Sequence, residues 1–495
     1  MLTYIKEEAN KTTTQNGAQT YLSTGSDCLD LFATIGALRS ASDSEIRERF
    51  ARAYFENKDL AMKILFFARD ARGGLGERRV FRTILSWLAI NEPQSVIKNI
   101  SYISEYGRYD DLLCLLGTRC EKETLDLISN QITEDLTNLL ENKNVSLLAK
   151  WMPSINASSA QTIQKARVIA NAMGISARYY RQMLSTLREY IGILENNLRM
   201  RDYSFDYEKQ PSRAMFKYRG AFARNDSARY WKFVEDVAAG KKQLHTDHVM
   251  PYELVEPYLG FSWSYGYDKM VMTDEQKAIL NATWNALPDY GGDEDILPVI
   301  DTSGSMYDIF CTPMPAAVAL SLGLYFAQRN KGMFRNHFIE FSRNAQLIEI
   351  KGETFADKLQ YVSTFSEVAN TNIEVVFDLI LNTAINNNLG QKDLPSKLVF
   401  ISDMEFDECT DNADMTNFEN AKAKFEAHGL KLPQIVFWNV YSSSRQQPVT
   451  QNAQGVILVS GVTPRIFEMV AGDHLDPYAF MMEVVGSERY ERIAA

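Results

Sequence analysis

Two carboxylates and three hydroxyls of this chain stand where they could bind a metal ion. The set is Asp301, Ser303, Ser305, Thr371 and Asp403. The first three directly follow an apolar run, 296–300, and Asp403 follows another, 398–401. All of these donors are oxygens, which are the ligands that Mg²⁺ and Mn²⁺ prefer in proteins. The pattern therefore predicts a site for Mg²⁺ or Mn²⁺.

Two alternatives to a working metal site stay open. Asp301 can cap the helix that follows it, with the two serines filling a turn. A motif of this kind can also be present without a functional metal. The order of the pieces, with each carboxylate at the end of an apolar run, favours the metal site.

Basic side chains interleaved with aromatic ones form a second candidate site. Residues 151–242 contain 16 Lys and Arg against 8 Asp and Glu, a net charge of +8. Such cations bind phosphates, and exposed aromatic rings stack on unpaired bases. A solvated basic face without a nucleic-acid role is the alternative. The predicted RNA contacts here are Lys165, Arg167, Arg178, Arg181, Arg188, Lys217, Arg219, Arg224 and Arg229.

A glycine-rich stretch at 69–79 adds four arginines to these candidates. Its glycines allow close approach of the backbone, and guanidinium groups suit phosphate. The stretch lacks the Lys-Ser/Thr ending of a phosphate-binding P-loop and follows no strand, which argues against a nucleotide site. The alternative is a corner between helices in which Arg69 and Arg72 pair with Asp70 and Glu77. The candidates are Arg69, Arg72, Arg78 and Arg79.

The elements that must position these residues change character near residue 285. From about 44 to 240, apolar residues recur at the helix period between closely spaced Gly and Pro breakers, which predicts short helices in stacked hairpins. After 295, short apolar runs alternate with helical segments, as in a mostly parallel sheet covered on both faces. We expect a helical array over 1–285 and a doubly wound α/β domain over 286–495. Such sheets bind ligands at the carboxyl ends of their strands.

The charge distribution separates these two parts. The 495 residues carry a net charge of −11, but residues 1–285 carry +2 and residues 286–495 carry −13. A polyanion would therefore bind the first part. No apolar run reaches the length of a bilayer-spanning helix, and the five cysteines form no CxxC pair. We expect a cytoplasmic protein without a membrane partner.

Catalysis finds little support in the sequence. No GxSxG or HExxH motif is present, and the five histidines do not group with a nucleophile. A hydrolase using the metal site would also need a positioned base, and none is evident. We therefore expect a protein that is not an enzyme.

The motifs together resemble a known family. Asp301-x-Ser-x-Ser with Thr371 and Asp403 resembles the metal-ion-dependent adhesion site of von Willebrand factor A domains. With the helical part, the chain resembles the Ro autoantigen family and its TROVE domain, and more closely a group of Ro-like proteins with a C-terminal A domain. The matching pieces are Arg69–Arg78, Gly107–Asp111, Leu148–Pro153, Asp301–Ser305, Ser402–Phe406 and Phe437–Asn439.

The resemblance implies a ring or horseshoe of HEAT-like helical repeats, which the A domain closes. It also implies a ribonucleoprotein scaffold that binds small noncoding RNA and the single-stranded ends of misfolded RNA, without catalysis. The alternative function is a metal-dependent protein-interaction module, in which the adhesion-type site captures a carboxylate of a protein partner and no RNA is bound.

Overall fold

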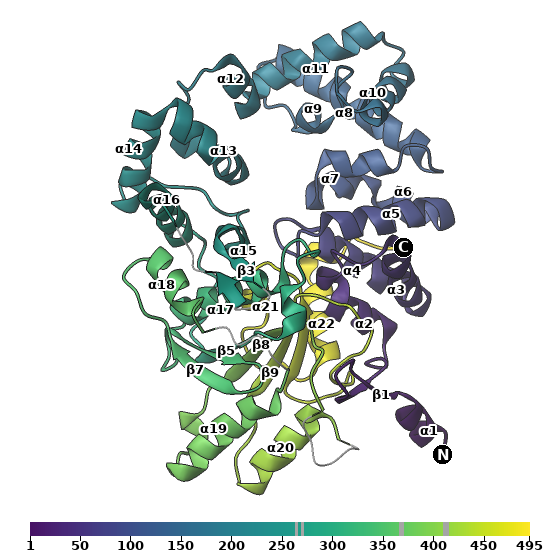
Figure 1. Cartoon of the computed structure of the whole chain (residues 1–495). Coiled ribbons are helices and arrows are strands. Elements are labelled where there is room, and N and C mark those ends of the chain that lie inside the picture. The colour runs from purple at the N-terminus through teal and green to yellow at the C-terminus, as the bar shows by residue number, and fades with distance from the viewer. Residues whose placement is uncertain (263–265, 269–271, 366–370, 409–414) are drawn as a thin grey trace. The chain divides into compact units, whose positions relative to one another are not determined.

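The chain forms two compact units (Figure 1). The computed structural model describes residues 1–262, 266–268, 272–365, 371–408 and 415–495. The sheet unit comprises Met1–Ile64 and Val234–Tyr490, and the helical unit comprises Leu65–Phe233 and Glu491–Ala495.

A six-stranded sheet organises the sheet unit. Its strands lie in the order β10-β9-β8-β5-β6-β7, and all neighbours are parallel except β6 and β7. The parallel α/β architecture predicted for this part is thereby confirmed. The antiparallel edge strand β7 was not predicted, because only Ile348 of its five residues is buried. The strands are β5 (Ile296–Asp301), β6 (His337–Phe341), β7 (Ala345–Glu349), β8 (Lys397–Ser402), β9 (Gln434–Asn439) and β10 (Val456–Ser460).

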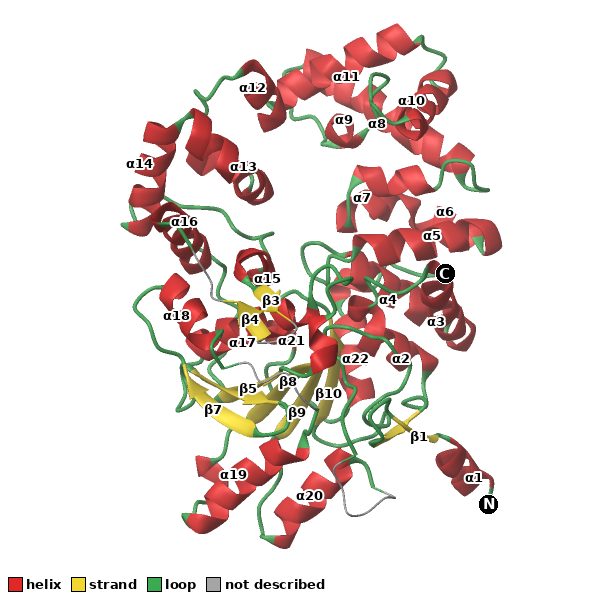
Figure 2. Ribbon diagram, in the orientation of Figure 1, coloured by secondary structure: helices red, strands yellow, loops and turns green. Residues whose placement is uncertain are grey.

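Helices cover both faces of this sheet (Figure 2). On one face, α19 (Glu374–Asn386) and α20 (Asn417–Ala427) bury aromatic and aliphatic side chains against β5, β6, β8, β9 and β10. On the other face, α17 (Pro315–Arg329) packs so closely that a Cβ at Gly323 would collide with Ile300 of β5. All six residues of β5 are buried as a result. A strand buried on both faces is held rigidly, which suits an element that presents a binding residue at its end.

The N-terminal residues also cover the sheet. Helix α2 (Asp27–Thr34) contacts β10 and α22 (Pro477–Val485). Its Phe32 ring lies 6.0 Å from the ring of Phe480, and the Gly36 N–H donates to Ser460 Oγ at 3.0 Å. The compact units thus differ from the predicted division at residue 285, because the buried side of α2 packs on the sheet and residues 234–285 also belong to the sheet unit.

The other elements of the sheet unit are shorter or more peripheral. They are α1 (Leu2–Ala9), β1 (Lys11–Thr13), β2 (Gln19–Tyr21), α3 (Asp43–Glu56), α15 (Pro251–Val255), β3 (Gly260–Ser262), β4 (Gly266–Asp268), α16 (Asp274–Asn285), α18 (Phe355–Val362) and α21 (Ile466–Met469). Helices α4 (Lys58–Arg69) and α14 (Ser227–Ala238) run across the limits of the two units.

Helices make up the helical unit, as predicted for this part of the chain. Serine side chains begin two of them, since Ser159 caps α10 and Ser176 caps α11. The last residues of the chain pack here, with Asn99 Nδ2 donating to the Ala494 carbonyl. No described helix has the length and apolar character needed to cross a membrane. The helices are α5 (Arg78–Asn91), α6 (Pro93–Asn99), α7 (Ile103–Tyr106), α8 (Glu121–Leu140), α9 (Leu148–Trp151), α10 (Ala160–Ala172), α11 (Ala177–Ile191), α12 (Leu194–Met200) and α13 (Ser212–Asn225).

Candidate functional site

Asp301 lies at the carboxyl end of β5, where the strand order reverses. Strands β6 and β7 continue the sheet on one side of β5, and β8, β9 and β10 on the other. Such a position is where open α/β sheets bind ligands. Because Ile300 pairs with Ile401, the end of β8 lies beside Asp301. Ser402 Oγ donates to Asp301 Oδ2 at 2.5 Å, which orients this fully buried carboxylate.

The two serines of the motif lie directly beyond Asp301. The Ser303 N–H donates to Asp301 Oδ1 at 2.8 Å, so the loop turns back toward the carboxylate. Ser303 Oγ and Ser305 Oγ are 3.2 Å apart. Ser303 is buried and Ser305 is exposed. The strand end thus presents one carboxylate and two neighbouring hydroxyls, of which the outer one reaches solvent.

Asp403 supplies the second carboxylate. It is 2% exposed, and its Oδ1 accepts the Glu405 N–H at 3.1 Å, but no described residue donates a hydrogen bond to the buried Oδ2. Burial and the negative charge of Asp301 raise the pKa of Asp403, and burial also raises the pKa of Asp301. A side-chain hydrogen bond from Ser305 opposes this rise in the pKa of Asp403. Two buried carboxylates that repel each other, one with an unsatisfied oxygen, are an arrangement that a cation would stabilise.

Thr371 adjoins this group through Asp407. It is buried, its N–H donates to Asp407 Oδ2 at 2.9 Å, and its carbonyl accepts the Asp407 N–H at 2.9 Å. Asp407 in turn acts on Asp301, whose pKa it raises. The structure therefore brings Asp301, Ser303, Ser305 and Asp403 together, and it connects Thr371 to them only through Asp407.

These residues fit the hard divalent cation that the motif predicts. The donors are carboxylate and hydroxyl oxygens, and Asp403 Oδ2 is a buried acceptor in need of a partner. No group of three or more His, Cys, Asp or Glu side chains that could hold a metal ion occurs in the part of the chain that the structure describes. With two direct carboxylates, the site would rely on hydroxyls and water for its other ligands.

Three further residues of the site were not among the sequence candidates. Ser402 orients Asp301, Asp407 binds Thr371, and Glu405 contacts Asp403. Ser402 is the last residue of β8, and the other two stand in the acidic run 403–408 that follows it. The concentration of acidic residues after a buried strand was visible in the sequence, but their separate roles depend on the path of the loop.

Two of the predicted RNA contacts are structural. Arg69 is 3% exposed, and its guanidinium pairs with the buried Asp111 at 2.7 Å. The half-buried Arg188 donates to the carbonyls of Ala149 and Met152 and to Ser154 Oγ. The donors of these two arginines are used inside the helical unit, and their contact with RNA stays a prediction.

Four other candidates donate hydrogen bonds to backbone carbonyls. Arg72 donates to the Glu105 carbonyl at 2.5 Å, and Lys165 donates to Leu113 at 3.0 Å. Arg219 donates to Phe216 at 2.5 Å, and Arg229 donates to Phe205 at 2.9 Å. Their charges remain, but the geometry of their side chains is set by the protein.

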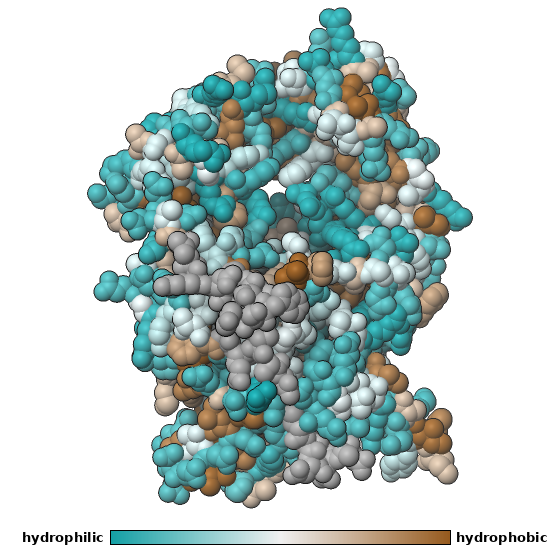
Figure 3. Space-filling view, in the orientation of Figure 1, coloured by the Kyte–Doolittle hydropathy of each residue, from teal (hydrophilic) through white to brown (hydrophobic). Residues whose placement is uncertain are grey.

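The remaining candidates are exposed. They are Arg78, Arg79, Arg167, Arg178, Arg181, Lys217 and Arg224. Helix α13 has four basic residues and no acidic one, and its Arg213, Lys217 and Arg224 lie at spacings that share one side of a helix. Arg213 was not among the sequence candidates. The face of the helical unit seen in Figure 3 is largely hydrophilic, with scattered hydrophobic residues.

The aromatic residues of this region divide between core and surface. Tyr180, Phe222 and Tyr230 are buried, and the last two rings pack together at 5.6 Å. Tyr179 is 53% exposed, and the Tyr218 ring lies under the Lys217 ammonium at 4.8 Å. Helix α11 therefore has an exposed ring at Tyr179, and α13 has a half-buried ring beside a cation at Tyr218.

Two protein-family models match this chain. A family model described as a domain of unknown function, DUF2828, matches residues 14–126 and 122–289, more than half of the sequence. The chain belongs to the DUF2828 family. In this DUF2828 protein, residues 295–482 match a second domain of unknown function, DUF7788, which covers the six-stranded sheet.

Two individual proteins are similar to this DUF2828 protein. An uncharacterized protein of Acanthamoeba polyphaga mimivirus is 28% identical over 523 residues, covering 96% of this chain and 87% of that protein. The crystal structure of the Deinococcus radiodurans Ro (RSR) protein is similar with a TM-score of 0.48 at 14% identity, covering 94% of this chain and 100% of that chain. The assignment to TROVE and von Willebrand factor A domains stays a prediction.

Proposed function

We propose that this protein is a non-catalytic RNA-binding scaffold. In this proposal the exposed cations of the helical unit hold the phosphates of single-stranded or small noncoding RNA. The sheet unit acts as a von Willebrand factor A domain that holds Mg²⁺. Closure of a ring by that domain and a cytoplasmic location stay predictions.

One observation supports RNA binding most strongly. The exposed side of α13 carries Arg213, Lys217 and Arg224 without any acidic residue on that helix, and α11 adds Arg178 and Arg181. A chain with a net charge of −11 that keeps such a surface fits a polyanionic partner. Tyr179 and Tyr218 lie among these cations, where rings can stack on bases.

A salt titration of RNA affinity tests this proposal. Each phosphate contact on a single strand contributes about 0.7 to the slope of log affinity against log salt concentration. Replacing Arg178, Arg181 and Arg224 with Ala should therefore reduce the slope by about 2. The control removes three exposed lysines of the sheet unit, Lys351, Lys392 and Lys422. Equal slopes in both variants, or no affinity for single-stranded RNA at low salt, would contradict the proposal.

A second candidate function rests on the metal site. Asp301, Ser303, Ser305, Asp403 and Thr371 would hold Mg²⁺, which when bound supplies a Lewis-acidic position for an oxygen of a partner. The observation in favour is the buried Asp403 Oδ2, to which no described residue donates a hydrogen bond. The side chains orient and neutralise the ion, and the exposed Ser305 marks the side open to a partner carboxylate.

Metal binding by the full chain tests this second function. Isothermal titration with Mg²⁺ or Mn²⁺ should give one site in the unmodified protein and none in Asp301→Ala. Capture of an acidic protein partner should then depend on the metal and be lost in the same variant. Binding that survives Asp301→Ala would place the metal elsewhere.

A further inference from the structure

The acidic loop after β8 is held by two segments from distant parts of the sequence. From the N-terminal side, Thr14 Oγ1 donates to the Phe406 carbonyl at 2.5 Å, and Asn16 Nδ2 donates to the Glu405 carbonyl at 2.6 Å. Gly17 forms an isolated β-bridge with Asp407. The segment 14–17 therefore follows the loop that begins at Asp403.

Glu405 connects these segments. Its side chain is 3% exposed, and its Oε2 accepts the Gln15 N–H at 3.0 Å and Gln446 Nε2 at 2.6 Å. Its Oε1 accepts Ser443 Oγ at 3.2 Å. The Glu405 N–H donates to Asp403 Oδ1 at 3.1 Å. One buried carboxylate thus joins the N-terminal segment and the loop 443–446, while its own backbone orients a candidate metal ligand.

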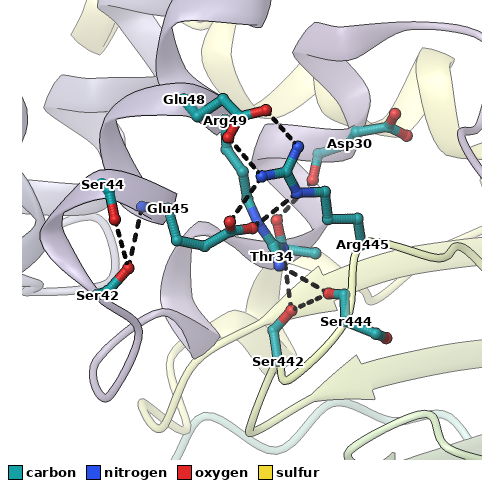
Figure 4. A network of polar contacts seen from close by, with 10 residues as sticks. All are labelled: Asp30, Thr34, Ser42, Ser44, Glu45, Glu48, Arg49, Ser442, Ser444 and Arg445. Atoms are coloured by element: carbon teal, nitrogen blue, oxygen red, sulfur yellow. Dashed lines mark hydrogen bonds and ion pairs between the residues drawn. The ribbon is translucent and has the colours of Figure 1, made fainter. Parts of the chain in front are cut away.

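The loop 443–446 is itself fixed to α3 (Figure 4). Arg445 forms bonds to both carboxylate oxygens of Glu45, at 2.9 and 2.6 Å, and to both of Glu48, at 2.6 and 2.7 Å. Arg49 donates to Ser442 Oγ at 3.0 Å and to the Ser444 carbonyl at 2.7 Å. The partners of Glu405 therefore do not move freely, since their loop is anchored by charge-assisted hydrogen bonds.

We infer that Glu405 is a positioning residue for the metal ligand Asp403, and that the segment 14–17 and the loop 443–446 are its fixed points. This inference rests on the proposed metal site. Residues that orient metal ligands typically change metal affinity by 10- to 100-fold when replaced. Part of the metal site would then lie outside residues 286–495, in the N-terminal segment.

The test is the affinity of the full chain for Mn²⁺, measured by the loss of the free-ion signal in electron paramagnetic resonance. Glu405→Gln should weaken Mn²⁺ binding by about tenfold or more. The matched control is Asp295→Asn at the opposite end of β5, where the carboxylate accepts the N–H groups of Met333 and Phe334. That variant loses a comparable anchor and should bind Mn²⁺ within about twofold of the unmodified protein.

Different results would overturn the positioning role of Glu405 and the proposed metal site. Mn²⁺ affinity unchanged in Glu405→Gln, or weakened equally in Asp295→Asn, would overturn the positioning role. If Glu405→Gln does not fold, Gln446→Ala removes the 2.6 Å bond alone and should still weaken Mn²⁺ binding. No Mn²⁺ binding by the unmodified chain, or equal binding by Asp301→Ala, would remove the proposed metal site and the positioning role together.

Discussion

Replacing Asp403 with Asn should stabilise the metal-free sheet unit and remove most of the stabilisation by Mg²⁺. Asp403 and Asp301 are buried together, and Asp403 Oδ2 receives no hydrogen bond from any described residue. Leaving a buried polar group unsatisfied costs about 1–3 kcal/mol, and more when it is charged. In EDTA at alkaline pH, Asp403→Asn should therefore raise the free energy of unfolding by about 1–3 kcal/mol.

With Mg²⁺ the balance should shift toward the unmodified chain by about 2.7 kcal/mol. Mg²⁺ at 100 times its dissociation constant adds about 2.7 kcal/mol to a protein that binds it only when folded. The unmodified chain should gain this amount, and Asp403→Asn should gain little. Urea unfolding followed by tryptophan fluorescence measures both the stability difference in EDTA and the stability gained with Mg²⁺. The reasoning is refuted if Asp403→Asn is destabilised in EDTA as much as Asp295→Asn, or if Mg²⁺ stabilises both proteins equally.

Three further predictions concern single contacts. Arg188→Ala should lower the free energy of unfolding by about 1–3 kcal/mol, because three internal hydrogen bonds are lost. The slope of log RNA affinity against log salt concentration should stay the same. A reduced slope would argue against the structural role of Arg188. Arg445, and then Arg49, lower the pKa of Glu45 to about 2, so these ion pairs stabilise the fold fully above the ordinary carboxyl pKa and lose that effect as the pH falls toward 2. Urea unfolding should therefore show a lower free energy of unfolding for Arg445→Ala at neutral pH, with a difference from the unmodified protein that narrows near pH 3. A difference that stays constant with pH would contradict this prediction. Gly323→Ala should lower the free energy of unfolding by about 1–3 kcal/mol, because the added methyl group collides with Ile300. The control is Gly220→Ala on α13, where the methyl group meets only Arg224 Nη1 at 3.4 Å and the change should stay within about 1 kcal/mol. Thermal unfolding of both variants tests this, and equal effects would contradict it.

The sheet and its ligand positions could be predicted because each buried strand is a continuous apolar run that ends in polar residues. Asp301 and Asp403 both follow such runs, and parallel strands bring their carboxyl ends to one edge. Strand β7 escaped prediction because an edge strand with one buried residue has no such run. The sequence contains Ser402 and Glu405 beside Asp403, but strand register decides which of them hydrogen-bonds to Asp301.

Contacts of single side chains with distant segments outside the sheet could not be predicted. Arg69 was expected to bind RNA or to pair with its neighbours Asp70 and Glu77, but its guanidinium pairs with Asp111, 42 residues away. In the same way, no pattern in the N-terminal residues indicated that α2 covers β10 or that Gln15 binds Glu405. A single sequence records which residues are apolar or charged, and such partners become known only when the chain is folded.

The most direct test of the proposed function is cross-linking of the full chain to uniformly labelled single-stranded RNA with ultraviolet light, followed by mass spectrometry of the peptides. The proposed function predicts cross-links in α11 and α13, with Tyr179 and Tyr218 among the modified residues, and their loss in the Arg178, Arg181 and Arg224 alanine variant. Cross-links confined to the sheet unit, or none above those of a protein without affinity for RNA, would contradict it.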